Sequence, residues 1–181
     1  NPQVTKFYCC FQDCTALKAL LPGLFDNNPL ADNFNNCFNG CKALETLPEG
    51  LFDNNPQVTT FAACFQDCAA LTELPPGLFA NNQLVEDFSY CFINCTALKL
   101  NATIFGKDPA CYQYRRMDFS RCFESVGKFL ATQEEVDASI APELWNYDTN
   151  DSVPWTTNGC FDKAKFSNKN GVPSAWGTPA N

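Results

Sequence analysis

The stretch FYCCFQDCTALKAL, residues 7–20, decides the fold because close copies of it return at a fixed interval. Its centre is a Cys-Phe-x-x-Cys tetrad that starts at Cys10 and starts again 27, 54 and 81 residues later, at Cys37, Cys64 and Cys91. A phenylalanine stands three residues before every tetrad, and a leucine stands three residues after it. A strict period between about 20 and 50 residues is the signature of stacked repeats that share one continuous core.

Four regular repeats begin at residues 1, 28, 55 and 82. A fifth, degenerate repeat keeps Phe119 and Cys122 at the expected spacing but has Val126 in place of the second cysteine. We therefore assign residues 1–127 to repeats. Residues 128–181 break the period, and we expect them to form a C-terminal cap that seals the last repeat and includes a half-repeat.

The two ends of the chain carry further signals. Residues 1–5 match residues 55–59, so the chain starts inside a repeat, and we expect natural sequence before it, such as a leader. In the cap, Thr132 followed three residues later by Glu135 is a capping box, which predicts the start of a helix. The cap also holds all three tryptophans, whose bulk suits a seal over the last repeat: Trp145, Trp155 and Trp176.

Each repeat is predicted to contain a helical segment, a short strand and a turn. In the first repeat, apolar residues fall on one face of a helix, at Val4, Phe7, Cys10, Phe11 and Cys14. Residues 16–20 then indicate a short strand, which Pro22 and Gly23 end. The expected fold class is α/β, with one short parallel strand and helical segments in each 27-residue repeat.

Stacking such repeats places equivalent phenylalanines above one another. Ladders of five, five and four rings account for 14 of the 17 phenylalanines, so packing explains the excess of this residue. The ladders are Phe7, Phe34, Phe61, Phe88 and Phe119; Phe11, Phe38, Phe65, Phe92 and Phe123; and Phe25, Phe52, Phe79 and Phe105.

The pattern Phe-x-x-Cys-Phe-x-x-Cys-x-x-Leu-x-x-Leu-Pro-x-Gly-Leu-Phe resembles the leucine-rich repeats of bacterial surface proteins of the BspA-like group. Residues 141–145, with Cys160 and Phe161, are similar to the end segment of such proteins from gut Bacteroidetes. The resemblance implies a right-handed leucine-rich-repeat solenoid, an exported or surface location, and adhesion or protein binding without catalysis. The repeat is longer than the common form of the family and carries an extra cysteine.

The twelve cysteines leave three alternatives open. They could be buried free thiols, because cysteine is among the most buried residue types. They could form disulfides, because cysteines four apart on a helix have Cα atoms about 6 Å apart, inside the permitted range. The favoured pairs are Cys10–Cys14, Cys37–Cys41, Cys64–Cys68 and Cys91–Cys95. A zinc array is disfavoured because a tetrahedral site needs four converging ligands, and we expect no metal.

The composition excludes several classes of function. The chain has no histidine, the commonest general base and metal ligand, so we expect neither an enzyme nor a bound cofactor. The net charge of −8 disfavours nucleic acid as a partner. No apolar run reaches the roughly 18 residues that a membrane span needs, so we expect no membrane insertion. A monomer is expected.

The candidate binding surface is the outward side of the predicted strand. Equivalent positions there vary while their neighbours recur, as expected for residues that core packing does not constrain. Lys18, Glu45, Thr72 and Lys99 occupy one such position, and Thr46 and Glu73 occupy the next. A plainer interpretation is that these side chains are only solvated, with Lys18 and Glu45 forming a weak surface ion pair.

These features together predict an extracellular or cell-surface bacterial scaffold that binds an unidentified protein. Two alternatives remain open. One is a carbohydrate- or mucin-binding module, in which the tryptophan rings of the cap stack on sugars. The other is a structural part, such as a repeat stalk or a phage-fibre component.

Overall fold

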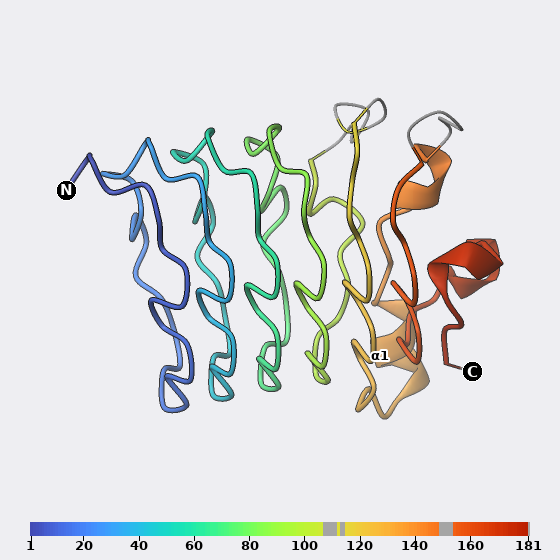
Figure 1. Ribbon diagram of the computed structural model, residues 1–181. Coiled ribbons are helices and arrows are strands. Elements are labelled where there is room, and N and C mark those ends of the chain that lie inside the picture. The colour runs from blue at the N-terminus through green and yellow to red at the C-terminus, as the bar shows by residue number, and fades with distance from the viewer. Residues whose placement is uncertain (107–111, 113–114, 149–153, 181) are drawn as a thin grey trace.

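The computed structural model describes residues 1–106, 112, 115–148 and 154–180. The chain winds into successive circuits of 27 residues, which we call coils. The first three coils are residues 1–27, 28–54 and 55–81, and the fourth begins at residue 82. Figure 1 shows the coils side by side, from the blue amino-terminal end to the red carboxy-terminal end. One sequence period therefore corresponds to one circuit of the stack.

The predicted α/β solenoid, a right-handed leucine-rich-repeat stack with a strand and helical segments in every repeat, is wrong. The described residues contain one α-helix, α1 (Gln133–Asp137), and it lies outside the regular repeats. The 3-10 helices that follow are η2 (Leu144–Asn146), η3 (Lys169–Gly171) and η4 (Ser174–Trp176). Within the described ranges, no helix has the length and apolar character needed to cross a membrane.

Single parallel bridges, rather than strands, link neighbouring coils. One bridge connects Ala19 to Thr46, inside the segment predicted to be a strand. A continuous series lies instead within the segment predicted to be helical. It joins Lys6, Asn33, Thr60, Asp87, Asp118 and Thr156 in that order. Neighbouring coils thus run parallel, but the pairing in the described part of the chain does not extend into a named strand.

The segment predicted to be a helix is a pair of tight turns. The Cys10 N–H donates to the Phe7 carbonyl at 3.3 Å, and the Cys14 N–H donates to the Phe11 carbonyl at 3.2 Å. The third residue of each turn has positive φ, 56° at Cys9 and 57° at Asp13. This is the requirement of a type II β-turn, and a right-handed helix cannot continue through it.

Alternate backbone groups in this segment hold the coils together. While the Cys10 and Cys14 N–H groups close their turns, the Phe7 and Phe11 N–H groups reach the next coil. They donate at 2.8 Å to the carbonyls of Asn33 and Cys37. Each coil therefore satisfies half of these backbone donors itself and gives the other half to its neighbour.

The three phenylalanine ladders are confirmed. In the third coil, Phe61 stacks on Phe34 at a centroid distance of 5.7 Å, and Phe65 stacks on Phe38 at 5.4 Å. All four rings are fully buried. Rings of different ladders also meet edge to face, a favourable arrangement that locks the ladders against one another. The core is therefore a column of aromatic rings along the axis of the stack.

A buried asparagine ladder runs beside the aromatic column. The Asn55 side-chain amide donates to the carbonyls of Phe25, near the end of the first coil, and Asn28, at the start of the second, at 3.1 and 2.9 Å. Asn82 repeats both contacts one coil later, with Phe52 and Asn55. Asn55 and Asn82 are fully buried. Each of these carbonyls also accepts an N–H of its own turn, so the asparagine amides supply a second donor that links one coil to the next.

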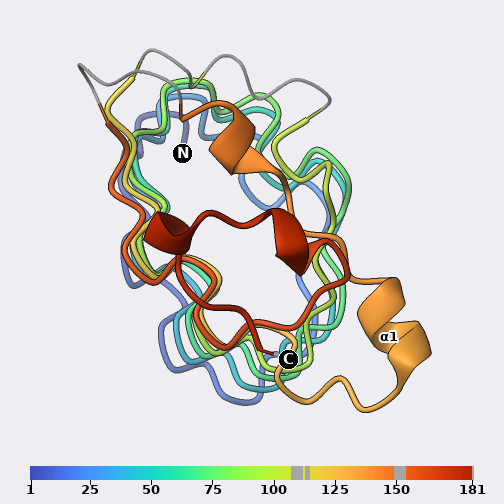
Figure 2. The same ribbon diagram turned by 90° about the vertical axis from the view of Figure 1, so that its right-hand side faces the viewer.

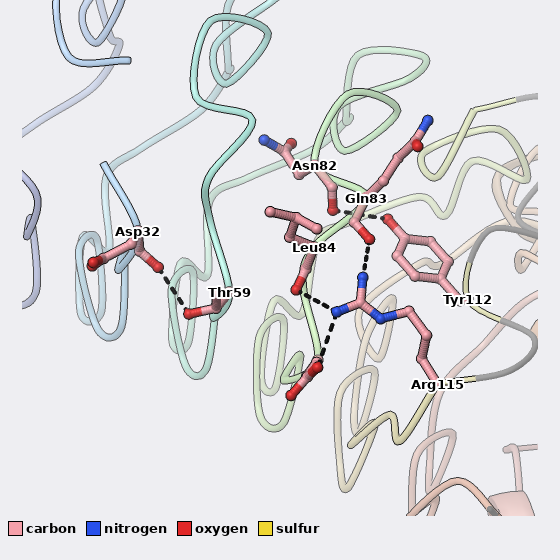
Figure 3. A network of polar contacts seen from close by, with 8 residues as sticks. Asp32, Thr59, Asn82, Gln83, Leu84, Tyr112 and Arg115 are labelled. Carbon is pink, nitrogen blue, oxygen red and sulfur yellow. Dashed lines mark hydrogen bonds and ion pairs between the residues drawn. The ribbon is translucent and has the colours of Figure 1, made fainter. Parts of the chain in front are cut away.

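The ladder continues past the regular repeats through a different side chain. The Tyr112 hydroxyl donates toward the Asn82 carbonyl at 3.4 Å (Figure 3). The Phe79 carbonyl lies 3.5 Å from the same hydroxyl and shares its proton. Close by, Arg115 donates to the carbonyls of Gln83 and Leu84 and pairs with Glu86. These contacts fasten Tyr112 and Arg115 to the region where the third coil ends and the fourth begins.

The C-terminal segment covers one end of the stack, as Figure 2 shows. Thr156 is bridged to Asp118, and Phe161 stacks on Phe123 at 5.2 Å, so this segment adds a further layer to the column. The capping box at the start of α1 is confirmed, since the Thr132 hydroxyl accepts from the Glu135 N–H. The exact division of the chain at residue 127 stays a prediction.

Candidate functional site

The six predicted binding residues lie together on one edge of the stack. The Glu45 N–H donates to the Lys18 carbonyl, and the Thr72 N–H donates to the Glu45 carbonyl, at 2.9 and 3.3 Å. The Lys99 N–H continues the series to Thr72 at 3.0 Å. We call this set the outward row: Lys18, Glu45, Thr46, Thr72, Glu73 and Lys99. Backbone bonds therefore fix the spacing of Lys18, Glu45, Thr72 and Lys99, one per coil.

Most side chains of the outward row are open to solvent. Lys99 is half-buried, while the other five residues are exposed. The Lys99 ammonium lies 2.9 Å from the Glu73 carboxylate, and the Lys18 ammonium lies 4.0 Å from that of Glu45. Exposed pairs of this kind contribute about 0–1 kcal/mol, so they do little for stability. The row is a surface whose charges remain accessible to a partner.

A groove of about 440 Å³ lies at the end of the outward row that is nearest to the C-terminal cap. Glu73 and Lys99 form one side of it, and Ala138 and Ile140 from the segment after α1 form the other. The Ile140 N–H donates to the Leu100 carbonyl at 3.0 Å, which holds this wall in place. Ile140 is nevertheless 44% exposed, so the groove offers an apolar patch beside an ion pair.

The sequence analysis missed the cap side of this groove. Ala138 and Ile140 lie about forty residues beyond Lys99 in the sequence, and no repeat pattern connects them to the row. The available signal was an isoleucine shortly after the start of a predicted helix. That signal does not say which coil the residue reaches, because the path of the cap depends on tertiary contacts.

The cysteines described by the structure are all free thiols, so none of the four favoured disulfides is formed. Cys111 lies outside the described residues. Eight of the thiols are buried, and three of them donate to main-chain carbonyls of the preceding coil. These three are Cys41, Cys68 and Cys95, whose acceptors are the carbonyls of Phe11, Phe38 and Phe65.

Burial makes these thiols weak nucleophiles. It raises the pKa of the Cys41 thiol to about 11, and the charge of Cys14 adds to the effect. Burial likewise raises the pKa of Cys64 and Cys91 well above the ordinary range. Since the thiolate is the reactive form, such cysteines behave as small apolar side chains. In the described ranges, no group of three or more acidic, cysteine or histidine side chains could hold a metal ion.

The tryptophans of the cap serve packing. Trp155 lies 5.3 Å from Phe119, and Trp176 lies 6.1 Å from Phe161. Trp145 contacts the edge of Phe161 at 5.7 Å. Trp155 and Trp176 are buried, so their faces are committed to the end of the aromatic column. Stacking of sugars on these two rings, on which the carbohydrate alternative depended, would require the cap to open.

Comparison with known proteins places few constraints on this chain. No family model and no curated protein matches it. Among solved structures, it is similar to a leucine-rich repeat protein from Bacteroides ovatus, with 16% identity and a TM-score of 0.26. The match covers 68% of this chain and 45% of that protein. A likeness of this size is too small to support an argument about function, which therefore depends on the geometry above.

Proposed function

We propose that this chain is a non-catalytic scaffold that binds a protein partner along the outward row. The stack presents charged and polar side chains one coil apart, and the groove beside Ile140 receives an apolar side chain of the partner. The observation that carries the proposal is the hydrogen-bonded register of Lys18, Glu45, Thr72 and Lys99. Repeat stacks of this kind commonly use extended surfaces for binding.

Buried and exposed residues have separate roles in the second coil, and this supports the proposal. Leu44 and Leu47 flank the row in the second coil, and both are buried in the core. Glu45 and Thr46 between them are exposed. The buried leucines fix the backbone, while the outward side chains are free to vary without a cost in packing. The partner is then recognised by the pattern of charges along the outward row and by the apolar groove beside Ile140.

The binding surface is tested by reversing its charge and removing its apolar end. The double variant Lys99→Glu/Ile140→Asp should lose proteins that the unchanged chain retains from an extract of cell-surface and secreted proteins. A purified captured protein should then bind the variant at least tenfold more weakly in calorimetry. Lys6→Glu is the matched control, because Lys6 is an exposed lysine of the bridge series on a different part of the coil. Equal loss with Lys6→Glu would argue against a specific surface.

We extend the proposal to a monomeric protein that acts outside the bacterial cell or on its surface. The alternative of a structural stalk predicts that copies of the chain associate with one another. Sedimentation velocity over a wide concentration range distinguishes the two, since a constant sedimentation coefficient supports the monomer. Fractionation of the source cells tests the location, and recovery of the protein only from the cytosol would contradict it.

A further inference from the structure

Phe129 is an exposed aromatic residue on an anchored stretch of backbone. It is 70% exposed, whereas its neighbour Leu130 is buried. The Phe129 N–H donates to the Thr96 carbonyl at 2.9 Å, and the Leu130 N–H donates to the Gly127 carbonyl at the same distance. The backbone at the base of the ring is therefore anchored to Thr96 and Gly127.

Gly127 explains why the chain takes this path. Its φ is +65°, and a Cβ atom there would lie 3.0 Å from the Lys165 carbonyl and 3.1 Å from the Leu98 carbonyl. Both the backbone angle and the close approach require glycine. The bend fixes the direction of the next residues, so the exposure of Phe129 is a consequence of the packed backbone rather than of a loose loop.

Phe129 forms one end of a shallow groove of about 410 Å³. The hydrogen bond to Thr96 places the ring in line with a series of equivalent residues, one from each of three coils: Lys42, Ala69 and Thr96. With about 4.8 Å between neighbouring coils, the groove extends about 14 Å from Lys42 to Phe129. The small side chain of Ala69 leaves its middle open.

A carboxylate and an amide line one side of the groove. The Asn94 side-chain amide donates to the Asp67 carboxylate at 2.8 Å, so the two groups are held next to each other. Both residues have positive φ, 61° and 58°, at the rigid turns of their coils. Asp67 offers acceptors only, while Asn94 offers a donor and an acceptor. Together they can bind neighbouring hydroxyl groups that both donate and accept.

We propose that this groove binds a short oligosaccharide. One face of a sugar ring carries C–H groups made slightly positive by the adjoining oxygens. It would pack on the face of the Phe129 ring opposite the Lys128 ammonium, which lies 6.0 Å from the ring centroid. The hydroxyls of the same or the next sugar would reach Asp67 and Asn94, with Lys42 at the far end. Ligand sites typically combine an apolar surface with a few fixed polar groups in this way. The groove is separate from the outward row, so the two proposals can fail independently.

The test uses the full chain and a panel of neutral oligosaccharides: maltotetraose, cellotetraose and lacto-N-tetraose. At least one should show saturation transfer from the protein in NMR at millimolar concentration, with shifts at the Phe129 and Thr96 amides. Phe129→Ala should weaken binding by about tenfold, the size expected for an aromatic contact. Asn94→Ala should weaken it several-fold.

Three further variants separate sugar stacking from a general apolar contact. Phe129→Tyr should retain binding, whereas Phe129→Leu should lose it, because a leucine has no aromatic face. Tyr8→Ala should have no effect, since Tyr8 is also an exposed aromatic residue, at 62%, but lies in the first coil. Equal binding by Phe129→Leu and the unchanged chain would overturn the proposal. So would the absence of binding to every member of the panel.

Discussion

Residues 1–14 and 55–68 have almost the same sequence and very different surroundings. NPQVTKFYCCFQDC and NPQVTTFAACFQDC differ at three positions. The backbone is the same in both, since φ is 57° at Asp13 and 58° at Asp67. Yet Cys10 is exposed in the first coil, and its equivalent Cys64 is fully buried in the third. The local sequence therefore sets the turns, while burial depends on the coils on either side.

The largest expected consequence of this difference is alkaline unfolding. Burial raises the pKa of eight thiols: Cys37, Cys41, Cys64, Cys68, Cys91, Cys95, Cys122 and Cys160. The folded state keeps these protons after unfolded thiols begin to ionise, near pH 8.5. Stability is therefore complete below that pH and falls above it, by up to about 1.4 kcal/mol per pH unit for each thiol. We expect unfolding by about pH 10 in the presence of a reductant.

Circular dichroism during a pH titration measures this effect. Replacing Cys64 and Cys68 by alanine should reduce the loss of stability per pH unit, although it also lowers stability at neutral pH. Replacing the exposed Cys10 should change the slope much less. An alkaline slope that is the same without Cys64 and Cys68 would show that the buried thiols do not control it.

The next largest effect compares two equivalent phenylalanines. Phe61→Ala should cost about 3–5 kcal/mol, because it removes a fully buried ring and leaves a cavity. Phe7→Ala should cost about half of that, since Phe7 is only partly buried. Urea denaturation followed by circular dichroism gives both values. Similar losses for the two variants would contradict the view that the neighbouring coils determine the contribution of a ring.

The asparagine ladder allows the same comparison between a buried residue and its exposed equivalent, with a smaller expected loss of stability. Asn55→Ala should cost about 1–3 kcal/mol, because it removes two hydrogen bonds to the Phe25 and Asn28 carbonyls, which then keep only the N–H groups of their own turns. Asn1 occupies the same repeat position but is exposed, and its side chain accepts from the Gln3 N–H instead. Asn1→Ala should therefore change the free energy of unfolding by less than about 0.5 kcal/mol. The same denaturation assay compares the two.

The smallest effect is expected on the outward row. Lys18→Ala removes one partner of an exposed ion pair whose atoms are 4.0 Å apart, and should change stability by less than about 0.5 kcal/mol. Thermal unfolding in low and high salt checks this. A large loss of stability would mean that the outward row has a structural role. Weaker partner binding by its variants would then reflect loss of folding rather than loss of a contact with the partner.

Sequence periodicity predicted the stack and its aromatic core, but it led to the wrong local structure. Phe7, Cys10, Phe11 and Cys14 have the 3-1-3 spacing of a helix face, and two successive four-residue turns give the same spacing. The distinguishing signal was the residue before the second cysteine. It is Asp13, Gly40, Asp67 or Asn94 in the four regular repeats, and these residue types tolerate positive φ.

The candidate site was predictable only in part. The variable positions of the outward row are visible in the aligned repeats, and the structure brings them together as a row. The groove at its end is formed partly by Ile140, and the second groove is formed partly by Phe129. Both residues follow the last regular repeat, where no period relates a residue to its neighbours in space. The asparagine ladder was visible as a recurring residue, but its burial was not.

The positive φ values also bear on how short a working fragment could be. Ordinary L-residues in this conformation each cost about 1–2 kcal/mol, and each regular coil has one or two of them, such as Ala63 and Asp67 in the third. An isolated coil would carry that cost without the hydrogen bonds and ring contacts of its neighbours. Folding should therefore begin with at least two adjacent coils and spread along the stack in a cooperative manner. Deleting one whole interior coil should be tolerated far better than deleting a few residues within it.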